Sequence, residues 1–126
     1  MLFLKQSTAA VIQFGPFLDK DDGITLKADG TTITDIDHAT TGIFLSKLGA
    51  NAAVRHQNVT ASAADDYGMM TVTLDTTDTN TLGALRMSFA KAATYLPVWQ
   101  DFIVVPANIY DSIILGTDTL KTAGRI

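Results

Sequence analysis

The chain has 126 residues, of which 47% are hydrophobic and only 17% charged, and its formal net charge is −4. This length suits one domain with a buried core, and the composition is too apolar for a disordered chain. The acidic balance argues against a nucleic-acid partner, because such binding depends on Lys and Arg that neutralise phosphates. The absence of cysteine excludes disulfides, thiolate nucleophiles and Cys-based zinc sites.

All thirteen acidic residues are Asp, none is Glu, and Thr is abundant. Asp favours turns and Thr favours strands, so this composition predicts a mainly β chain. No apolar run approaches the roughly 20 residues of a membrane-spanning helix, and we expect no membrane contact. The first residues lack the pattern of a secretory signal, which predicts a protein made in a cytoplasm.

The first third of the chain alternates β-branched and apolar residues with turn residues. Residues 8–17 predict an opening strand that ends at Gly15-Pro16, because proline cannot donate to a ladder. An Asp-rich turn then leads to a second strand over residues 24–28. The Asp29-Gly30 pair is typical of a two-residue hairpin, whose return strand is predicted over residues 32–36.

The middle of the chain contains the clearest strand signal. Residues 43–47 predict a short strand and residues 53–59 a weaker one, followed by a polar connection. In residues 70–74 the apolar side chains fall on one face and the threonines on the other, as in a half-buried antiparallel strand. Residues 85–89 repeat this alternation, and we expect the two segments to be neighbours in one sheet.

The last third combines a strand with a helix. Residues 98–105 carry little polar surface, which predicts a central strand that is buried on both faces. From Pro106 to Gly116 the apolar period changes to four residues, which predicts a short amphipathic helix that closes the domain. The polar tail, residues 117–126, is expected to be ordered only in an assembly.

Roughly seven short strands separated by Gly, Asp and Asn turns predict one domain over residues 1–116. The expected fold is mainly β: an immunoglobulin-like antiparallel β-sandwich with a short C-terminal helix. The order of the strands does not follow from this pattern.

Residue types with catalytic or metal-binding chemistry are few and scattered. His38 and His56 lack a second His or a Cys at metal-ligand spacing. Asp19, Asp21 and Asp22 suggest a calcium loop, but their spacing is compressed and a plain acidic turn is favoured. Nucleophile and phosphate-binding motifs are absent, so we expect no catalytic residue, no metal and no cofactor.

Four aromatic residues are dense in the last third: Tyr95, Trp99, Phe102 and Tyr110. Such rings could form a stacking platform for sugar, because they combine a large contact area with polar neighbours. Packing of the last strand against the helix is the favoured interpretation of the same residues.

Five stretches, distributed over nearly the whole chain, resemble segments of a known protein family. They are LKQSTAA (residues 4–10), GPFLD (15–19), TTDTNTLG (76–83), LPVWQDFIVVPANIYDS (96–112) and GTD (116–118). These stretches resemble a family of structural proteins of tailed bacteriophages and prophages, in which the module often begins a longer fibre-like or tail-associated chain. The present chain departs from that pattern by ending soon after residue 118 and by having Gly-Met-Met at residues 68–70, where an aromatic pair is common.

The resemblance implies a non-enzymatic component of a virion that decorates the capsid or joins tail components. A distal, host-binding region is not expected, since the chain ends early. The expected partners are other virion proteins and the chain itself. The alternative is a carbohydrate-binding adhesion module that uses the loops or the aromatic residues near Trp99.

Apolar residues at both ends of the chain are the expected contacts with neighbours, because a lone domain would leave them loose. These residues are Leu2, Phe3, Leu4, Tyr110, Ile114, Leu115 and Leu120.

Overall fold

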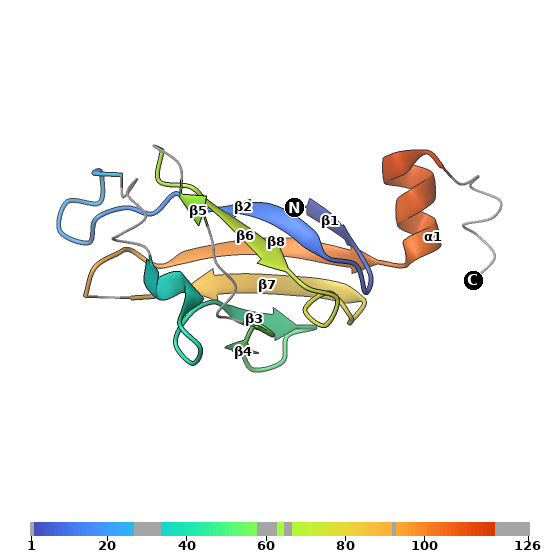
Figure 1. The fold of residues 1–126 in the computed structure, drawn as a ribbon, viewed down its shortest axis with the longest axis horizontal. Coiled ribbons are helices and arrows are strands. Elements are labelled where there is room, and N and C mark those ends of the chain that lie inside the picture. The colour runs from blue at the N-terminus through green and yellow to red at the C-terminus, as the bar shows by residue number, and fades with distance from the viewer. Residues whose placement is uncertain (1, 27–33, 58–62, 65–66, 92, 118–126) are drawn as a thin grey trace.

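The computed structural model describes residues 2–26, 34–57, 63–64, 67–91 and 93–117. It is mainly β, with two sheets and one short helical segment, as the composition predicts (Figure 1). The strands are β1 (Leu2–Lys5), β2 (Ala10–Phe14), β3 (Phe44–Lys47), β4 (Ala53–Val54), β5 (Ala63–Ala64), β6 (Met70–Leu74), β7 (Gly83–Phe89) and β8 (Val98–Val105).

The strands form a five-stranded sheet in the order β1-β8-β7-β3-β4 and a three-stranded sheet in the order β2-β6-β5. All neighbours are antiparallel except β1 and β8, which run parallel. The expectation of a wholly antiparallel arrangement is therefore wrong at this one pair. The chain leaves β1 for the other sheet, so the partner of β1 comes from the opposite end of the sequence.

The core is built by the alternating residues of both sheets. In β6 the side chains of Met70, Val72 and Leu74 point inward, as their period of two predicts. An aromatic cluster fills one end of the core, with ring centroids 5.6 to 6.1 Å apart. Its members are Phe14, Phe17, Phe89 and Tyr95, all buried.

Two of the predicted strands in the first half take other forms. Residues 24–26 contribute only an isolated bridge between Leu26 and Leu18, and residues 34–37 form a 3₁₀ helix, η1 (Thr34–Asp37). Within η1 a turn conformation buries Ile36 and directs Asp37 toward Arg55, which an extended strand would not do. The predicted hairpin at Asp29-Gly30 lies outside the described residues.

The prediction that residues 70–74 and 85–89 are sheet neighbours is wrong. β6 lies between β2 and β5, whereas β7 lies between β3 and β8 in the other sheet. The loop between them crosses from sheet to sheet. A period of two reveals which face of a strand is buried but not which strand lies beside it. β5 also falls in the segment expected to be a connection.

β8 is an inner strand, as predicted, but only one of its faces is buried. Phe102 and Val104 point into the core, whereas Trp99 on the opposite face is 62% exposed. Since no described helix or sheet covers that face, the expectation of burial on both sides is wrong. Tyr95 and Phe102 lie in the core instead of packing against the helix.

The predicted helix begins after Pro106 and stops at Gly116, which adopts a left-handed conformation with φ of 67°. It consists of α1 (Ala107–Tyr110) and a wider, π-type turn, η2 (Asp111–Leu115). None of its residues is buried, and the helix stands beyond the end of β8 (Figure 1). It therefore does not close the domain, because its apolar side chains meet β1 and not the core.

Candidate interaction surface

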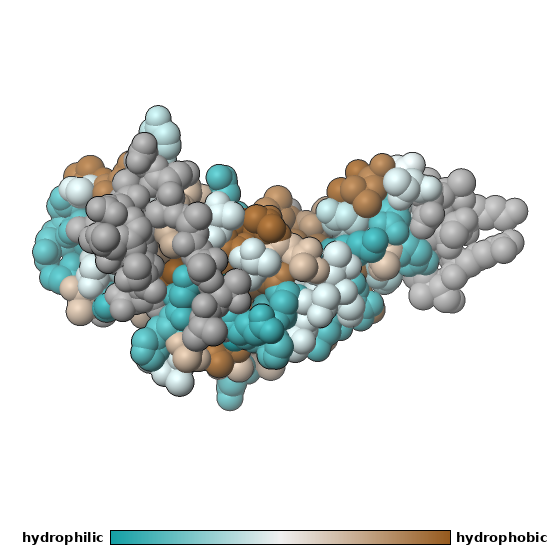
Figure 2. Space-filling model, viewed as in Figure 1, coloured by the Kyte–Doolittle hydropathy of each residue, from teal (hydrophilic) through white to brown (hydrophobic). Residues whose placement is uncertain are grey.

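Residues from opposite ends of the chain meet where β1 ends and α1 begins. Phe3 and Val105 of the sheet and Ile109, Ile113 and Ile114 of the helical segment line a small hollow of about 40 Å³, together with Tyr110. We call these six residues the terminal surface. Figure 2 shows apolar surface at the position of β1 and again on α1, with a notch in the outline between them.

Local sequence explains how each side chain reaches this surface. β1 alternates, so Leu4 points into the core while Phe3 points to the outer side of the sheet. Pro106 ends β8 and begins the helix, where the spacing of four residues puts Ile109 and Ile113 on one side. An ion pair of 2.9 Å between Lys5 Nζ and Asp111 Oδ1 joins the helix to β1.

Most of the predicted contact residues lie at this end of the molecule. Leu2, Phe3, Ile114 and Leu115 are between 45% and 56% exposed, and Tyr110 is partly exposed. Leu4 is the exception, because its side chain is only 6% exposed and belongs to the core. Leu120 lies outside the described residues.

Ile109 and Ile113 belong to the surface although the sequence interpretation did not assign them to it. Their spacing was the available signal, and it correctly predicted an amphipathic helix. The apolar stripe was expected to face the core, as it does in most helices of small domains. In this fold it remains exposed, with Ile113 at 62%.

β1 lies at the edge of the five-stranded sheet. Its backbone pairs with β8 on one side, from Leu2 opposite Phe102 to Lys5 opposite Val105. On the other side no strand of the described residues lies beside it. An open edge strand with apolar side chains is a template for contact with another chain.

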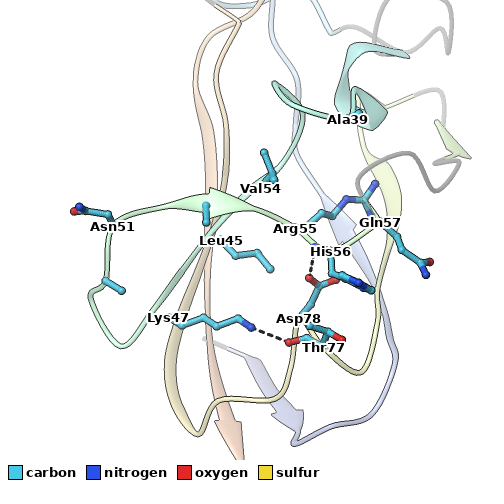
Figure 3. A pocket seen from close by; sticks show the side chains of 12 residues that line it. Ala39, Leu45, Lys47, Asn51, Val54, Arg55, His56, Gln57, Thr77 and Asp78 are labelled. Atoms are coloured by element: carbon cyan, nitrogen blue, oxygen red, sulfur yellow. Dashed lines mark hydrogen bonds between the residues drawn. The ribbon is translucent and has the colours of Figure 1, made fainter.

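A second and larger hollow, of about 680 Å³, lies beside β3 and β4 (Figure 3). Small apolar residues line part of it, and polar side chains line the rest. Lys47 Nζ donates to the carbonyl oxygen of Thr77 (2.7 Å) and to Asn80 Oδ1 (2.9 Å). No tyrosine, tryptophan or phenylalanine is among its lining residues, so it offers no stacking platform for a sugar.

The fully buried guanidinium of Arg55 organises the wall of this hollow. It donates to Asp37 Oδ1 and to the carbonyl oxygen of Thr73, each at 2.8 Å. Nearby, the buried carboxylate of Asp78 accepts bonds from the backbone N–H of His56 (2.7 Å) and of Asp75 (3.0 Å). These groups connect the loop after β6 with the segment after β4, which is a structural role.

The pKa values of the charged groups in this network shift in opposite directions. Burial lowers the pKa of Arg55 and raises the pKa of Asp78. The hydrogen bond with Asp75 raises the pKa of His56. Burial acts to raise the pKa of Asp75, but the bond with His56 and the backbone N–H donors outweigh it and lower that pKa.

The pair of His56 and Asp75 should make stability depend on pH. Because the pKa of folded His56 is raised above 6.5, its stabilising effect is fully present below pH 6.5 and is lost as pH rises through the folded value. The pKa of Asp75 is lowered below 3.8, so its contribution is lost only as pH falls below that value. Thermal unfolding of wild type and His56→Ala should therefore differ most between these limits and converge at alkaline pH. In an Asp75→Ala background, adding His56→Ala should change the unfolding temperature by an amount that does not depend on pH.

The acidic turn at residues 19–23 uses its carboxylates within the loop. Asp19 Oδ1 accepts the backbone N–H of Asp21 (2.7 Å), and Asp22 Oδ1 accepts that of Ile24 (2.8 Å). Within the part of the chain that the structure describes, no three His or Asp side chains are grouped to hold a metal ion. No helix in these ranges is long and apolar enough to cross a membrane.

Comparisons of the chain with protein-family models, with curated proteins and with solved structures find no match.

Proposed function

We propose that this protein is a non-enzymatic structural component of a tailed-phage virion, and that it docks on the particle through the terminal surface. The observation that carries this proposal is the meeting of Phe3 with Ile113 and Ile114 at an open sheet edge. Its partners are other virion proteins on the capsid or tail, together with further copies of itself.

The size of the terminal surface suits a repeated assembly. Phe3, Ile113 and Ile114 are each roughly half exposed, so burying them stabilises a contact by about 1 kcal/mol per side chain. That is too little for a tight complex between two isolated molecules. Many identical contacts on one particle provide the missing stability through multivalency.

The proposed scaffold is an immunoglobulin-like sandwich, which the strand order supports. Read across each sheet, β2-β6-β5 corresponds to strands B, E and D of that fold, and β8-β7-β3-β4 corresponds to G, F, C and C′. β1 departs from the pattern by joining the edge of β8, and the cysteine pair of antibody domains is absent. Such a fold hosts many functions, so the docking role rests on the surface and not on the scaffold.

Competition for places on the particle tests this function. Tagged wild type and Ile113→Ser are produced in infected cells, and their amounts on purified particles are compared. We expect the substitution to reduce incorporation about tenfold or more, because each lost contact is multiplied over the lattice. Cryo-electron microscopy of the wild-type particles then locates the protein on the capsid or the tail.

The matched control is Ile24→Ser, since Ile24 is 80% exposed and lies outside the terminal surface. This variant should be incorporated like wild type. Equal incorporation of Ile113→Ser would contradict docking through the terminal surface. Absence of the wild-type protein from every particle would contradict the virion role itself.

The exposure of Trp99 favours one second candidate, a carbohydrate-binding module. Its ring is 62% exposed and lies beside Gln100 and Asp101, which are suitable polar partners for sugar hydroxyls. Trp99 is the only tryptophan, so its fluorescence reports sugar binding directly. A saturable change on titration with bacterial polysaccharide would support this candidate, and an unchanged spectrum would remove it.

A further inference from the structure

On the outer face of the five-stranded sheet, the side chains of the neighbouring inner strands β7 and β8 follow a regular pattern. In each pair of opposite residues β8 carries the larger or the acidic side chain, and β7 carries the smaller or the basic one. The three pairs are Trp99 opposite Ser88, Asp101 opposite Arg86, and Ile103 opposite Ala84.

This face is open in the described part of the chain. Trp99 is 62% exposed, and the charged side chains of Arg86 and Asp101 are 58% and 38% exposed. Phe3 and Val54, on the outer strands, are 49% and 41% exposed. The helix stands beyond the end of the sheet and does not lie over it (Figure 1).

We infer that this face binds a second copy of the chain about a two-fold axis that runs between β7 and β8, parallel to the strands. Such an axis places β8 of each copy over β7 of the other, because in an isologous contact each pair of facing residues occurs twice with the two copies exchanged. Trp99 of one copy then lies over Ser88 of the other, and Ile103 lies over Ala84. Large side chains thus meet small ones in both directions.

The charges on this face also favour a second copy of the chain as its partner. With that axis Asp101 of each copy faces Arg86 of the other, which adds two contacts of opposite charge between the copies. Among the described residues, Lys5 and Arg86 balance Asp101 and Asp111, so the charged side chains that the structure places on this face and at its helical end cancel. Two acidic copies meet least repulsion through a face of this kind.

The area sets the expected strength. The five strands together hold 25 residues, and at about 3.4 Å along and 4.8 Å across a strand for each residue they give a face on the order of 400 Å². A standard interface buries about 800 Å² on each partner, so the dimer is expected to be weak. An axis parallel to the strands keeps the facing strands aligned at the centre, and the twist of each sheet makes them diverge away from it, so the pairing is best near Arg86 and Asp101.

Mixing two charge-reversal variants tests the axis. In Arg86→Asp both central positions are acidic, and in Asp101→Arg both are basic, so each variant alone should be monomeric. An equimolar mixture should form a heterodimer, because every acidic position then faces a basic one. Sedimentation equilibrium up to about 1 mM measures both states. If Arg86 and Asp101 paired only within one chain, the mixture would form no heterodimer.

A matched control removes the effect of overall charge. Each reversal changes the net charge of −4 by two units, so Arg86→Asp has −6 and Asp101→Arg has −2. Lys20→Asp and Asp21→Arg have the same two net charges but lie in the exposed loop after β2. Each of these variants should dimerise like wild type, alone or mixed.

Substitution of the tryptophan gives an independent result. Trp99→Ser should keep the circular dichroism of wild type and raise the dimer dissociation constant about tenfold or more, since buried tryptophans dominate interface energies. An unchanged constant would overturn the proposal. So would a wild-type protein that stays monomeric at about 1 mM, or a Trp99 that binds polysaccharide in a monomer. The proposal stands independently of docking, because the test uses the isolated protein and leaves the terminal surface unaltered.

Discussion

Replacing Arg55 by Met should lower the free energy of unfolding by about 3–5 kcal/mol, since breaking a buried ion pair leaves its partner charge uncompensated. The Arg55 side chain is fully buried and donates to Asp37 and to the backbone of Thr73. Asp78, only 2% exposed, loses a neighbouring positive charge as well. Urea unfolding followed by far-ultraviolet circular dichroism measures the loss.

The exposed ion pair of Arg86 and Asp101 provides the comparison. Its two bonds are as short, at 2.7 and 3.0 Å, but both side chains are exposed. Arg86→Met should therefore leave the stability of the monomer nearly unchanged, because solvent screens an exposed ion pair. If Arg55→Met proved equally mild, the buried network would not hold the two loops together.

Phe17→Ala should cost a similar amount, about 3–5 kcal/mol, because it removes the centre of the aromatic cluster. Phe17 is fully buried, and its ring makes edge contacts with Phe14, Phe89 and Tyr95. Such losses approach the whole stability of a small domain, so the variant is expected to be partly unfolded at room temperature. Phe17→Leu, which keeps most of the volume, should remain folded and allow the effect to be measured.

Trp99→Ala is the control for the core substitution. It removes a larger ring, yet the stability of the monomer should change by no more than about 0.5 kcal/mol, because the ring lies mostly in solvent. A loss as large as that of Phe17→Ala would contradict the placement of the Trp99 ring in solvent.

The two proposed surfaces complement each other in an assembly. A dimer formed through the outer sheet face would carry the helical part of two terminal surfaces, one on each copy, whereas Phe3 belongs to both surfaces. Two linked docking sites bind a particle far more tightly than one, provided that their spacing matches the lattice. A substitution that weakens the dimer should then also reduce incorporation, while Ile113→Ser should leave the isolated dimer intact.

Local patterns predicted much of the secondary structure. The alternation in residues 70–74 matches β6 in both bounds and buried face, and the segments near β2, β3, β7 and β8 were also expected. The helix after Pro106 and its end at Gly116 followed from proline and glycine chemistry. These signals lie within a few neighbouring residues, which is why sequence alone carries them.

The candidate surface was only partly predictable. The sequence indicates apolar residues at both ends of the chain, but residues 2–5 form β1 where a loose end is expected. Leu4, an expected surface contact, points into the core because β1 alternates its side chains between the two faces of the sheet. The partner of β1 is β8, whose paired residues lie 100 positions further along the chain, and no local pattern reports such a pairing.

The sequence by itself therefore determined that this protein is mainly β, where most of its strands lie and where its helix stops. Only the tertiary structure decided that β6 and β7 belong to different sheets, that Arg55 is buried against Asp37, and that Trp99 faces outward. The physical reason is that strand propensity and turn chemistry act between neighbours in the chain. Sheet partners, burial and charge pairing depend on residues that only folding brings together.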